Sequence, residues 1–304
     1  MAVAFLFAGQ GAQYPGMGKE LYEQSVAAKA VMDRCEAIRP GTLQMCFSGE
    51  KEALNQTVHT QPCLFAVDLA CGAALAEAGI LAGAAAGFSL GEWAAAAFGG
   101  MMTVETAFSL VVKRAAYMEE CAKRHPGAMA AVLRLEADQV EALCEEIGEL
   151  YPVNYNCPGQ IVVSGKEASI DTLTERVKPL RGRVMPLPVS GPFHTLYMGE
   201  AAEQMAGELG NISLHPPTIP LYANVNGQPY GKEMVGTLSS QIESPVRWQR
   251  TMEQLWEDGF DSFVELGPGK TLSGFLGRMA FPATICHVED MMSIMETVER
   301  LGGR

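Results

Sequence analysis

Residues 87–92 read Gly-Phe-Ser-Leu-Gly-Glu, and the G-x-S-x-G spacing around Ser89 could place a nucleophile. Glycines two residues before and after a serine let the backbone turn sharply from a strand into a helix. Such a turn exposes the hydroxyl and brings the next N–H beside it, so one turn supplies a nucleophile and part of an oxyanion hole. The motif predicts acyl transfer, and the alternative is a glycine-rich turn whose serine caps the following helix.

A serine nucleophile needs a base, and histidine is the usual one because its pKa lies near neutrality. His194 follows a proline-containing loop at the rim of a predicted cleft between two domains. His287 comes late in the chain, as the histidine of an ordinary α/β-hydrolase does, and Asp258 or Asp261 could be its acid. Spacing favours His194 narrowly, and His287 stays open as the rival.

Arg114 is a charged residue on the apolar side of a predicted helix. It shares a helix face with Leu110 and Met118 by three- and four-residue spacing. A guanidinium on such a face needs a partner, and its planar fork suits a carboxylate. Two interpretations stay open: an ion pair within the chain, for example with Glu119 or Glu120, or a clamp for the carboxylate of a substrate.

A glycine-rich turn follows the first predicted strand, where residues 8–13 read Ala-Gly-Gln-Gly-Ala-Gln. The glycines allow close approach of the backbone, and a glutamine amide could face a developing negative oxygen. The turn lacks the lysine and the spacing of a phosphate-binding loop. Taken alone, it predicts a strand-to-loop turn with glutamines that face solvent.

The composition is typical of a globular protein, with 304 residues of which 48% are hydrophobic and 19% charged. The formal net charge of −13 argues against a nucleic-acid partner. Eight scattered cysteines and five dispersed histidines show no metal-ligand spacing, so we expect reduced thiols in a cytoplasmic protein without a metal. The apolar N-terminus breaks at Gly9, so we expect neither a membrane span nor a signal peptide.

One positive stretch stands out in this acidic chain, formed by Arg176, Lys178, Arg181 and Arg183. It is either the solvated end of a helix, which we favour at this point, or a docking surface for an anionic partner.

Strand-like and helix-like segments alternate up to about residue 124, which predicts an α/β fold with a parallel sheet. The strands are expected at 3–7, 84–86, 221–223 and 262–266, and the helices at 16–38, 61–78, 104–123, 198–209 and 247–258. The three alanines at 84–86 are poor strand formers, so burial must override propensity there.

The rhythm changes at residue 127 to strands at 128–135, 153–156, 160–164 and 183–189, with helices at 137–148 and 167–180. This βαββαβ order is ferredoxin-like. We therefore expect an α/β-hydrolase-like core over 1–126 and 196–304, with a ferredoxin-like subdomain inserted at 127–195. Substrates usually bind in the cleft between two such units.

Together these motifs resemble the family of malonyl-CoA:acyl carrier protein transacylases, whose fold also serves as the acyltransferase domain of polyketide synthases. Seven motifs occur in the family's order: Gly-Gln-Gly-Ala-Gln at 9–13, G-x-S-x-G at 87–91, Arg114, Asn-Cys-Pro-Gly-Gln at 156–160, Phe-His at 193–194, Ser-Pro-Val-Arg-Trp at 244–248 and Glu-Leu-Gly-Pro-Gly-Lys at 265–270. Each motif is weak or moderate alone, and seven in register are specific. The resemblance decides the histidine question for His194.

The resemblance implies a ping-pong reaction that supplies malonyl units for fatty acid biosynthesis. Ser89 would attack the thioester of malonyl-CoA while His194 takes its proton. The N–H groups of Leu90 and Gln10 would hold the oxyanion. The malonyl group would then pass to the phosphopantetheine thiol of acyl carrier protein, and no cofactor beyond these substrates is implied.

The family's pattern also assigns the remaining site residues. Arg114 would bind the free carboxylate of malonyl, and Gln61 would line the active site. A backbone carbonyl, that of Arg247, would orient His194 in place of an acid. Phe193 would crowd a methyl branch, because a phenylalanine before the histidine accompanies malonyl use in the polyketide relatives.

One departure from the family is Phe88, which stands where a histidine is usual; we expect altered local packing and little effect on chemistry. The acidic carrier protein would dock on the positive stretch or on Lys123 and Arg124, and we expect a monomer. The alternatives are a stand-alone acyltransferase of a polyketide pathway and a hydrolase of the same fold that removes acyl groups from carrier proteins.

Overall fold

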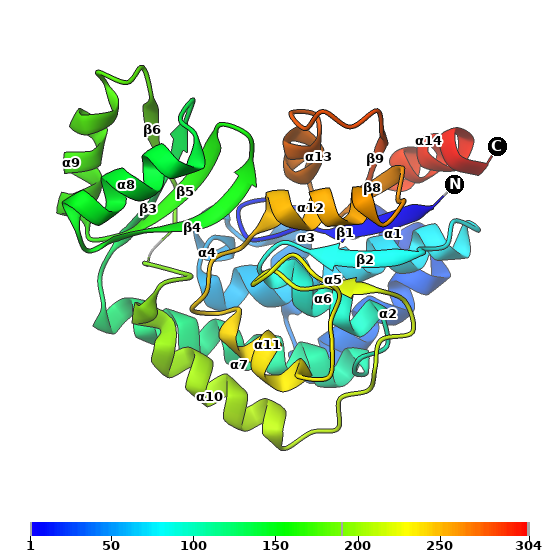
Figure 1. The fold of residues 1–304 in the computed structure, drawn as a ribbon. Helices are drawn as coiled ribbons and strands as arrows, with labels where there is room; N and C mark the ends of the chain where they lie inside the picture. Colours follow the sequence, from blue (N-terminus) through cyan, green and yellow to red (C-terminus); the bar gives the residue numbers. More distant parts are fainter. Residues whose placement is uncertain (1, 190, 303–304) are drawn as a thin grey trace.

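The structure is a computed structural model that describes residues 2–189 and 191–302 (Figure 1). Its strands are β1 Val3–Phe7, β2 Ala84–Gly87, β3 Ala128–Leu133, β4 Leu150–Cys157, β5 Gln160–Gly165, β6 Arg183–Pro186, β7 Leu221–Tyr222, β8 Ser262–Leu266 and β9 Thr284–Val288. Its helices are α1 Lys19–Gln24, α2 Val26–Ile38, α3 Thr42–Ser48, α4 Lys51–Leu54, α5 Thr57–Glu77, α6 Leu90–Phe98, α7 Val104–Arg124, α8 Ala137–Ile147, α9 Glu167–Val177, the 3₁₀ turn η1 Leu196–Met198, α10 Gly199–Gly210, α11 Met234–Ser240, α12 Trp248–Glu257, α13 Thr271–Leu276 and α14 Met291–Gly302.

Five parallel strands form the central sheet in the order β7-β2-β1-β8-β9. Successive side chains of a strand point to opposite faces. In β1, Ala4 and Leu6 accordingly join the core under α12 and α13, whereas Phe5 and Phe7 join the larger core with α5 and α6. Figure 1 shows these two helix layers on opposite sides of the sheet.

Strand β2 forms from alanines, whose intrinsic strand propensity is low, so burial must account for it. All four of its residues are buried, and each pairs with a residue of β1. Alanines suit this position because helices cover both faces of the sheet and small side chains let α6 approach closely. The weak strand prediction at 84–86 is thus confirmed by packing rather than by propensity.

A second sheet of four antiparallel strands has the order β4-β5-β3-β6. Its chain order is βαββαβ, and α8 and α9 share its small hydrophobic core. The α/β fold with a parallel sheet and a ferredoxin-like subdomain is therefore confirmed. Backbone hydrogen bonds from Tyr155 N to Val246 O (2.9 Å) and from Val246 N to Val153 O (2.7 Å) join β4 to the segment before α12.

Helix α5 is long and apolar enough to span a membrane, yet 83% of its most apolar stretch is buried inside the fold. It packs against α2 and α7 and carries Gln61 in its second turn. The apolar run is a core helix of this structure.

Candidate active site

Ser89 occupies a strained turn between the end of β2 and the start of α6, with φ 50° and ψ −101°. Two glycines make the turn possible. A Cβ on Gly87 would lie 1.9 Å from the carbonyl carbon of Gly91, and a Cβ on Gly91 would lie 2.2 Å from the carbonyl oxygen of Phe7. The G-x-S-x-G spacing is therefore a steric requirement. The alternative, in which Ser89 serves as a helix cap, is wrong because its side chain accepts no hydrogen bond from the backbone of α6.

The hydroxyl Oγ of Ser89 lies 2.7 Å from Nε2 of His194, which also has a positive φ of 60°. The other ring nitrogen, Nδ1, faces the backbone carbonyls of Gln241 (2.9 Å) and Ser244 (3.1 Å). A carbonyl oxygen only accepts hydrogen bonds, so Nδ1 carries the hydrogen and Nε2 is free to accept the serine proton.

The protonation state of His194 suits a general base. Burial, followed by the positive charge of Arg114, lowers the pKa of His194 to about 4, against the smaller opposing effect of the two carbonyl hydrogen bonds. The imidazole is therefore neutral at pH 7 and can accept a proton from Ser89.

Arg247 is not the residue whose carbonyl orients His194, and that expectation is wrong. Arg247 precedes the first residue of α12, and its carbonyl accepts from the N–H (2.9 Å) and the hydroxyl (3.0 Å) of Thr251. A helix-starting carbonyl is committed to the helix. The guanidinium of Arg247 lies 5.4 Å from the ring centroid of Tyr155 instead.

Arg114 is fully buried and has no carboxylate within ion-pair distance in the part of the chain that the structure describes. Its Nη1 donates to Gln61 Oε1 (2.8 Å), while its Nη2 donates to Ser89 Oγ (3.3 Å) and to Gln241 Oε1 (3.1 Å). Its Nε has no partner at all among the described residues. Burial lowers the pKa of Arg114 to about 9, against the opposing charge of Glu92, which leaves the guanidinium charged at pH 7.

The internal ion pairs considered for Arg114 form elsewhere. Glu119 pairs with Lys123 and Glu120 with Arg124, each four residues further along α7. Arg114 is thus a buried cation that no described carboxylate contacts directly, and Glu92 is the acid whose charge acts on it from further away. Its Nη2 lies beside the Ser89 hydroxyl.

A cavity of about 70 Å³ opens at Ser89 and His194. Its lining includes three further residues expected at the site, Gln10, Gln61 and Phe193. Gly9 brings the Gln10 loop against the turn, because a Cβ there would lie 2.7 Å from the carbonyl oxygen of Phe88. Within the described residues, the N–H groups of Gln10 and Leu90 donate to no other protein group, so both remain free for a ligand.

A larger cavity of about 500 Å³ shares Gln10 and Phe88 with the small one and extends between the Gln10 loop and β4. It is lined by Asn154 and Asn156, whose side-chain oxygens are buried and accept no hydrogen bond within the described chain. The site therefore has an approach with a largely apolar lining that has room for a slender substrate arm.

Two buried side chains at the site, Asn224 and Gln241, were not expected from the sequence. Asn224 accepts the Ser89 N–H (2.8 Å) and donates to the Gly87 carbonyl (2.7 Å), so it holds both sides of the turn. No motif marks either residue, and the contact from Gln241 to Arg114 spans 127 positions. Glu92, at the end of the serine motif, is also buried and accepts from Tyr230.

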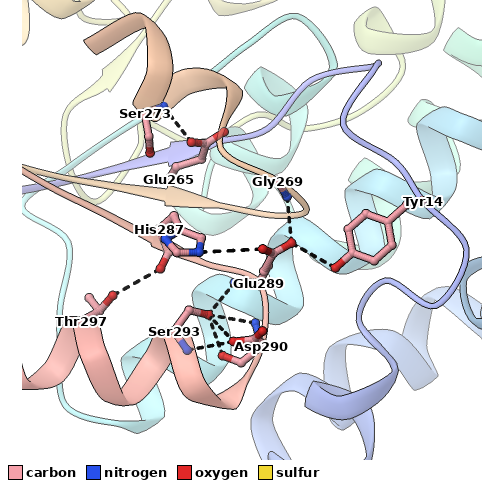
Figure 2. A network of polar contacts seen from close by, with 9 residues as sticks. All are labelled: Tyr14, Glu265, Gly269, Ser273, His287, Glu289, Asp290, Ser293 and Thr297. Carbon is pink, nitrogen blue, oxygen red and sulfur yellow. Dashed lines mark hydrogen bonds and ion pairs between the residues drawn. The ribbon is translucent and has the colours of Figure 1, made fainter. Parts of the chain in front are cut away.

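His287 lies apart from this site, in the network of Figure 2, which includes Tyr14, Glu289 and Ser293. Its Nε2 is 3.8 Å from Glu289 Oε1. The acids considered for it are engaged elsewhere: Asp258 accepts from the Tyr222 hydroxyl and Asp261 from the N–H of Ala2. The structure therefore excludes the rival assignment.

Phe88 packs in an aromatic cluster and also lines the small cavity at Ser89. Its ring centroid lies 5.5 Å from that of Trp248, edge-on, and 6.1 Å from that of Phe275. The described residues contain no group of three or more His, Cys, Asp or Glu side chains arranged to hold a metal ion.

Comparisons with known proteins agree with this geometry. Residues 4–278 match the model of the acyl transferase domain family. The chain is 34% identical to the malonyl CoA-acyl carrier protein transacylase of Bacillus subtilis, over 98% of this chain and 97% of that protein. The crystal structure of the malonyl CoA-acyl carrier protein transacylase from Clostridium perfringens superposes with a TM-score of 0.95 at 36% identity and covers 100% of this chain and 98% of that one.

A third match is a malonyl-transacylase solved in complex with a type II PKS acyl-carrier protein, with a TM-score of 0.94, 29% identity and coverage of 99% of this chain and 100% of that one. With a strained serine turn, a neutral histidine and full-length relatives, the chain belongs to the acyl transferase domain family.

Proposed function

We propose that this chain is an acyl-carrier-protein S-malonyltransferase, which moves malonyl from malonyl-CoA to the phosphopantetheine thiol of acyl carrier protein. The observation that carries the proposal is Arg114, a buried guanidinium that forms no direct ion pair within the described residues and whose Nη2 lies 3.3 Å from Ser89 Oγ. An acyl group with a free carboxylate at its far end places that charge against the guanidinium while its thioester reaches the hydroxyl. Full-length relatives of this activity support the same assignment.

In the first half-reaction, Ser89 Oγ attacks the thioester carbon and His194 Nε2 accepts the hydroxyl proton. The carbonyl oxygen becomes an oxyanion, which the N–H groups of Leu90 and Gln10 stabilise. When the tetrahedral intermediate collapses, the C–S bond breaks, and His194 returns the proton to the departing thiolate of coenzyme A. Ser89 is left as a malonyl ester.

The second half-reaction runs the same steps in reverse order with a new thiol. His194 takes the proton of the carrier's phosphopantetheine thiol, whose sulfur attacks the malonyl ester. The ester C–O bond then breaks and Ser89 recovers its proton. The larger cavity supports this route, because it adjoins the cavity at Ser89 through Gln10 and Phe88 and has room for a phosphopantetheine arm.

The test is the intact mass of the protein after brief exposure to malonyl-CoA, before and after addition of holo acyl carrier protein. A malonyl adduct that is absent in S89A and that moves to the carrier is expected. An adduct that decays to free malonate while the carrier stays unmodified would identify the alternative, an acyl carrier protein hydrolase. Transfer to a fatty acid carrier in preference to a polyketide carrier would separate the two pathways.

Phe193 supports malonyl over methylmalonyl as the substrate. Its side chain is buried and lines the 70 Å³ cavity with Ser89, where a branched acyl group would need additional room. We expect F193S to acquire acylation by methylmalonyl-CoA, measured as the ratio of the two acylation rates in a mixture. Unchanged discrimination in a folded F193S would contradict this steric account.

Arg181 and Arg183 support a docking surface for the acidic carrier. Both are exposed, and neither forms an ion pair within the described chain, whereas Arg176 pairs with Glu146 and Lys178 with Glu175. The alternative pair of cations on α7, residues 123 and 124, is neutralised in the same way. We expect R181E/R183E to raise the KM for carrier protein about tenfold and to leave acylation by malonyl-CoA unchanged. An unchanged KM for the carrier would reject this surface.

A cytoplasmic location fits the thiols. All eight cysteines are free and buried, as expected for a protein that works in a reducing compartment.

A further inference from the structure

Gln241 contacts each of the three groups that the proposed reaction needs. Its backbone carbonyl lies 2.9 Å from Nδ1 of His194. Its side-chain Oε1 accepts from Arg114 Nη2 (3.1 Å), and its side-chain Nε2 donates to the backbone carbonyl of Ser89 (2.5 Å). The residue is fully buried, at the end of α11. Of these contacts, the two made by the side chain have no role in the reaction as described so far.

The neighbours of the Gln241 amide fix which way it points. The guanidinium of Arg114 is purely a donor, so the amide oxygen must face it. On the other side are acceptors only: the Ser89 carbonyl, Oδ1 of Asn224 at 3.5 Å, and the nearby Glu92 carboxylate, whose pKa a hydrogen bond with Gln241 helps to lower against the larger effect of burial. The amide nitrogen must therefore face them. A flipped amide would oppose oxygen to oxygen and donor to donor. The orientation is therefore unique.

The contact with the Ser89 carbonyl also reaches the oxyanion hole. This carbonyl and the N–H of Leu90 are the two ends of one planar peptide group, so holding the oxygen sets the direction of the N–H. The same oxygen accepts from the N–H of Glu92 at 3.2 Å, which is a long bond in the first turn of α6. Because Ser89 has backbone angles outside the helical and sheet regions, this peptide needs support from a side chain.

Arg114 and Ser89 are therefore linked twice. Arg114 Nη2 donates directly to Ser89 Oγ and, through the Gln241 amide, reaches the peptide that carries the Leu90 N–H. We propose that the side chain of Gln241 is a positioning residue that couples recognition of the acyl carboxylate by Arg114 to the alignment of Ser89 and of the Leu90 N–H. This inference rests on the proposed malonyl transfer and adds a residue that makes the reaction sensitive to the carboxylate.

The variant Q241M tests this role, because it keeps the length of the side chain and the backbone carbonyl at His194 but removes the amide's hydrogen bonds, including those to Arg114 and to the Ser89 carbonyl. Its matched control is Q228M, which removes a side-chain hydrogen bond of 2.8 Å to Gln254, away from Ser89, Arg114 and His194. The measurement is rapid-quench intact mass with saturating malonyl-CoA, which gives a rate constant for acylation and an amplitude. We expect Q241M to be about 10- to 100-fold slower at full amplitude, since an oxyanion donor is misaligned rather than removed. We expect Q228M to be within twofold of the natural chain.

A double-variant cycle with R114Q tests the coupling itself. We expect Q241M to slow acylation much less in the R114Q background than in the natural chain, because the guanidinium that it orients is gone. Fully multiplicative losses would reject the coupling. A Q241M acylation rate within threefold of that of the natural chain would also reject it. A reduced amplitude at an unchanged rate would reject it too, because the amplitude then reports only the fraction of misfolded protein. If the natural chain takes up no malonyl at all, the proposed function fails first, and the coupling fails with it.

Discussion

Two histidines lie near the carboxyl ends of the parallel strands, and they are built into the protein differently. His194 has its Nε2 2.7 Å from the Ser89 hydroxyl and its Nδ1 against two backbone carbonyls. His287, in β9, has its Nε2 3.8 Å from Glu289, and its own carbonyl accepts from Thr297 (Figure 2). Burial lowers the pKa of both side chains. A lowered pKa therefore does not distinguish a base from a structural histidine.

The partners of the two ring nitrogens make the distinction. Carbonyls at Nδ1 of His194 fix the hydrogen there, so Nε2 is an acceptor directly beside a hydroxyl. A carboxylate near Nε2 of His287 instead favours a hydrogen on that nitrogen. Among the described residues, no hydrogen bond joins the His287 ring to a serine. The comparison teaches that the partners of both ring nitrogens decide whether a histidine can act as a general base. In His194, the partners of Nδ1 are backbone carbonyls.

Replacing each histidine by alanine is the strongest way to break this comparison. We expect H194A to slow acylation of Ser89 by malonyl-CoA by about 10³-fold or more, because the hydroxyl loses its proton acceptor. H287A should change the rate less than twofold. Both rates come from rapid-quench intact mass, and thermal melting of each variant reports folding. A comparable loss of rate in folded H287A would overturn the assignment.

The sequence predicted the parts of this site that lie on regular elements. Strands β1 and β8 were expected with their observed bounds, since both are short apolar runs that end at glycine-containing turns. The turn at Ser89 was predictable because only glycine fits at 87 and 91. The absence of an ion pair from Arg114 to Glu119 or Glu120 was also predictable, because i,i+4 spacing pairs these two acids with Lys123 and Arg124.

The contacts that tertiary structure alone creates could not be predicted. Gln241 follows the short helix α11, and nothing in its neighbourhood in the sequence points to a residue 127 positions away. The carbonyls at His194 are backbone groups, which leave no mark in a sequence. The resemblance placed that role at Arg247, whereas the structure places it at Gln241 and Ser244, earlier in the chain. Helix capping by Arg247 is the physical reason that its carbonyl was already engaged.

The fall of the acylation rate at low pH, the acid limb of the pH–rate profile, gives a smaller effect that also depends on the surroundings of His194. His194 is active as a base when neutral, so its own titration should lower the acylation rate only as the pH approaches its pKa of about 4. Part of the lowering of this pKa comes from the charge of Arg114, which a malonyl carboxylate neutralises and an acetyl group does not. With saturating acyl-CoA, the acid limb should therefore lie at higher pH for malonyl-CoA than for acetyl-CoA. Coincident limbs would show that Arg114 and His194 are not coupled electrostatically.

A histidine placed next to Ser89 in the sequence tests whether proximity is enough. F88H introduces the family's usual residue into the aromatic cluster of Trp248 and Phe275, next to the small cavity that Ser89 and His194 also line. We expect less than a threefold change in acylation rate, and a loss of about 1 kcal/mol in the free energy of unfolding as the edge-on aromatic contact disappears. The decisive variant is F88H/H194A, followed by malonyl uptake and urea unfolding. It should be as inactive as H194A, because the new imidazole has neither the carbonyls that fix its hydrogen nor a lone pair directed at Oγ. Recovered malonyl uptake would show that adjacency, rather than the partners of both nitrogens, makes a histidine a base here.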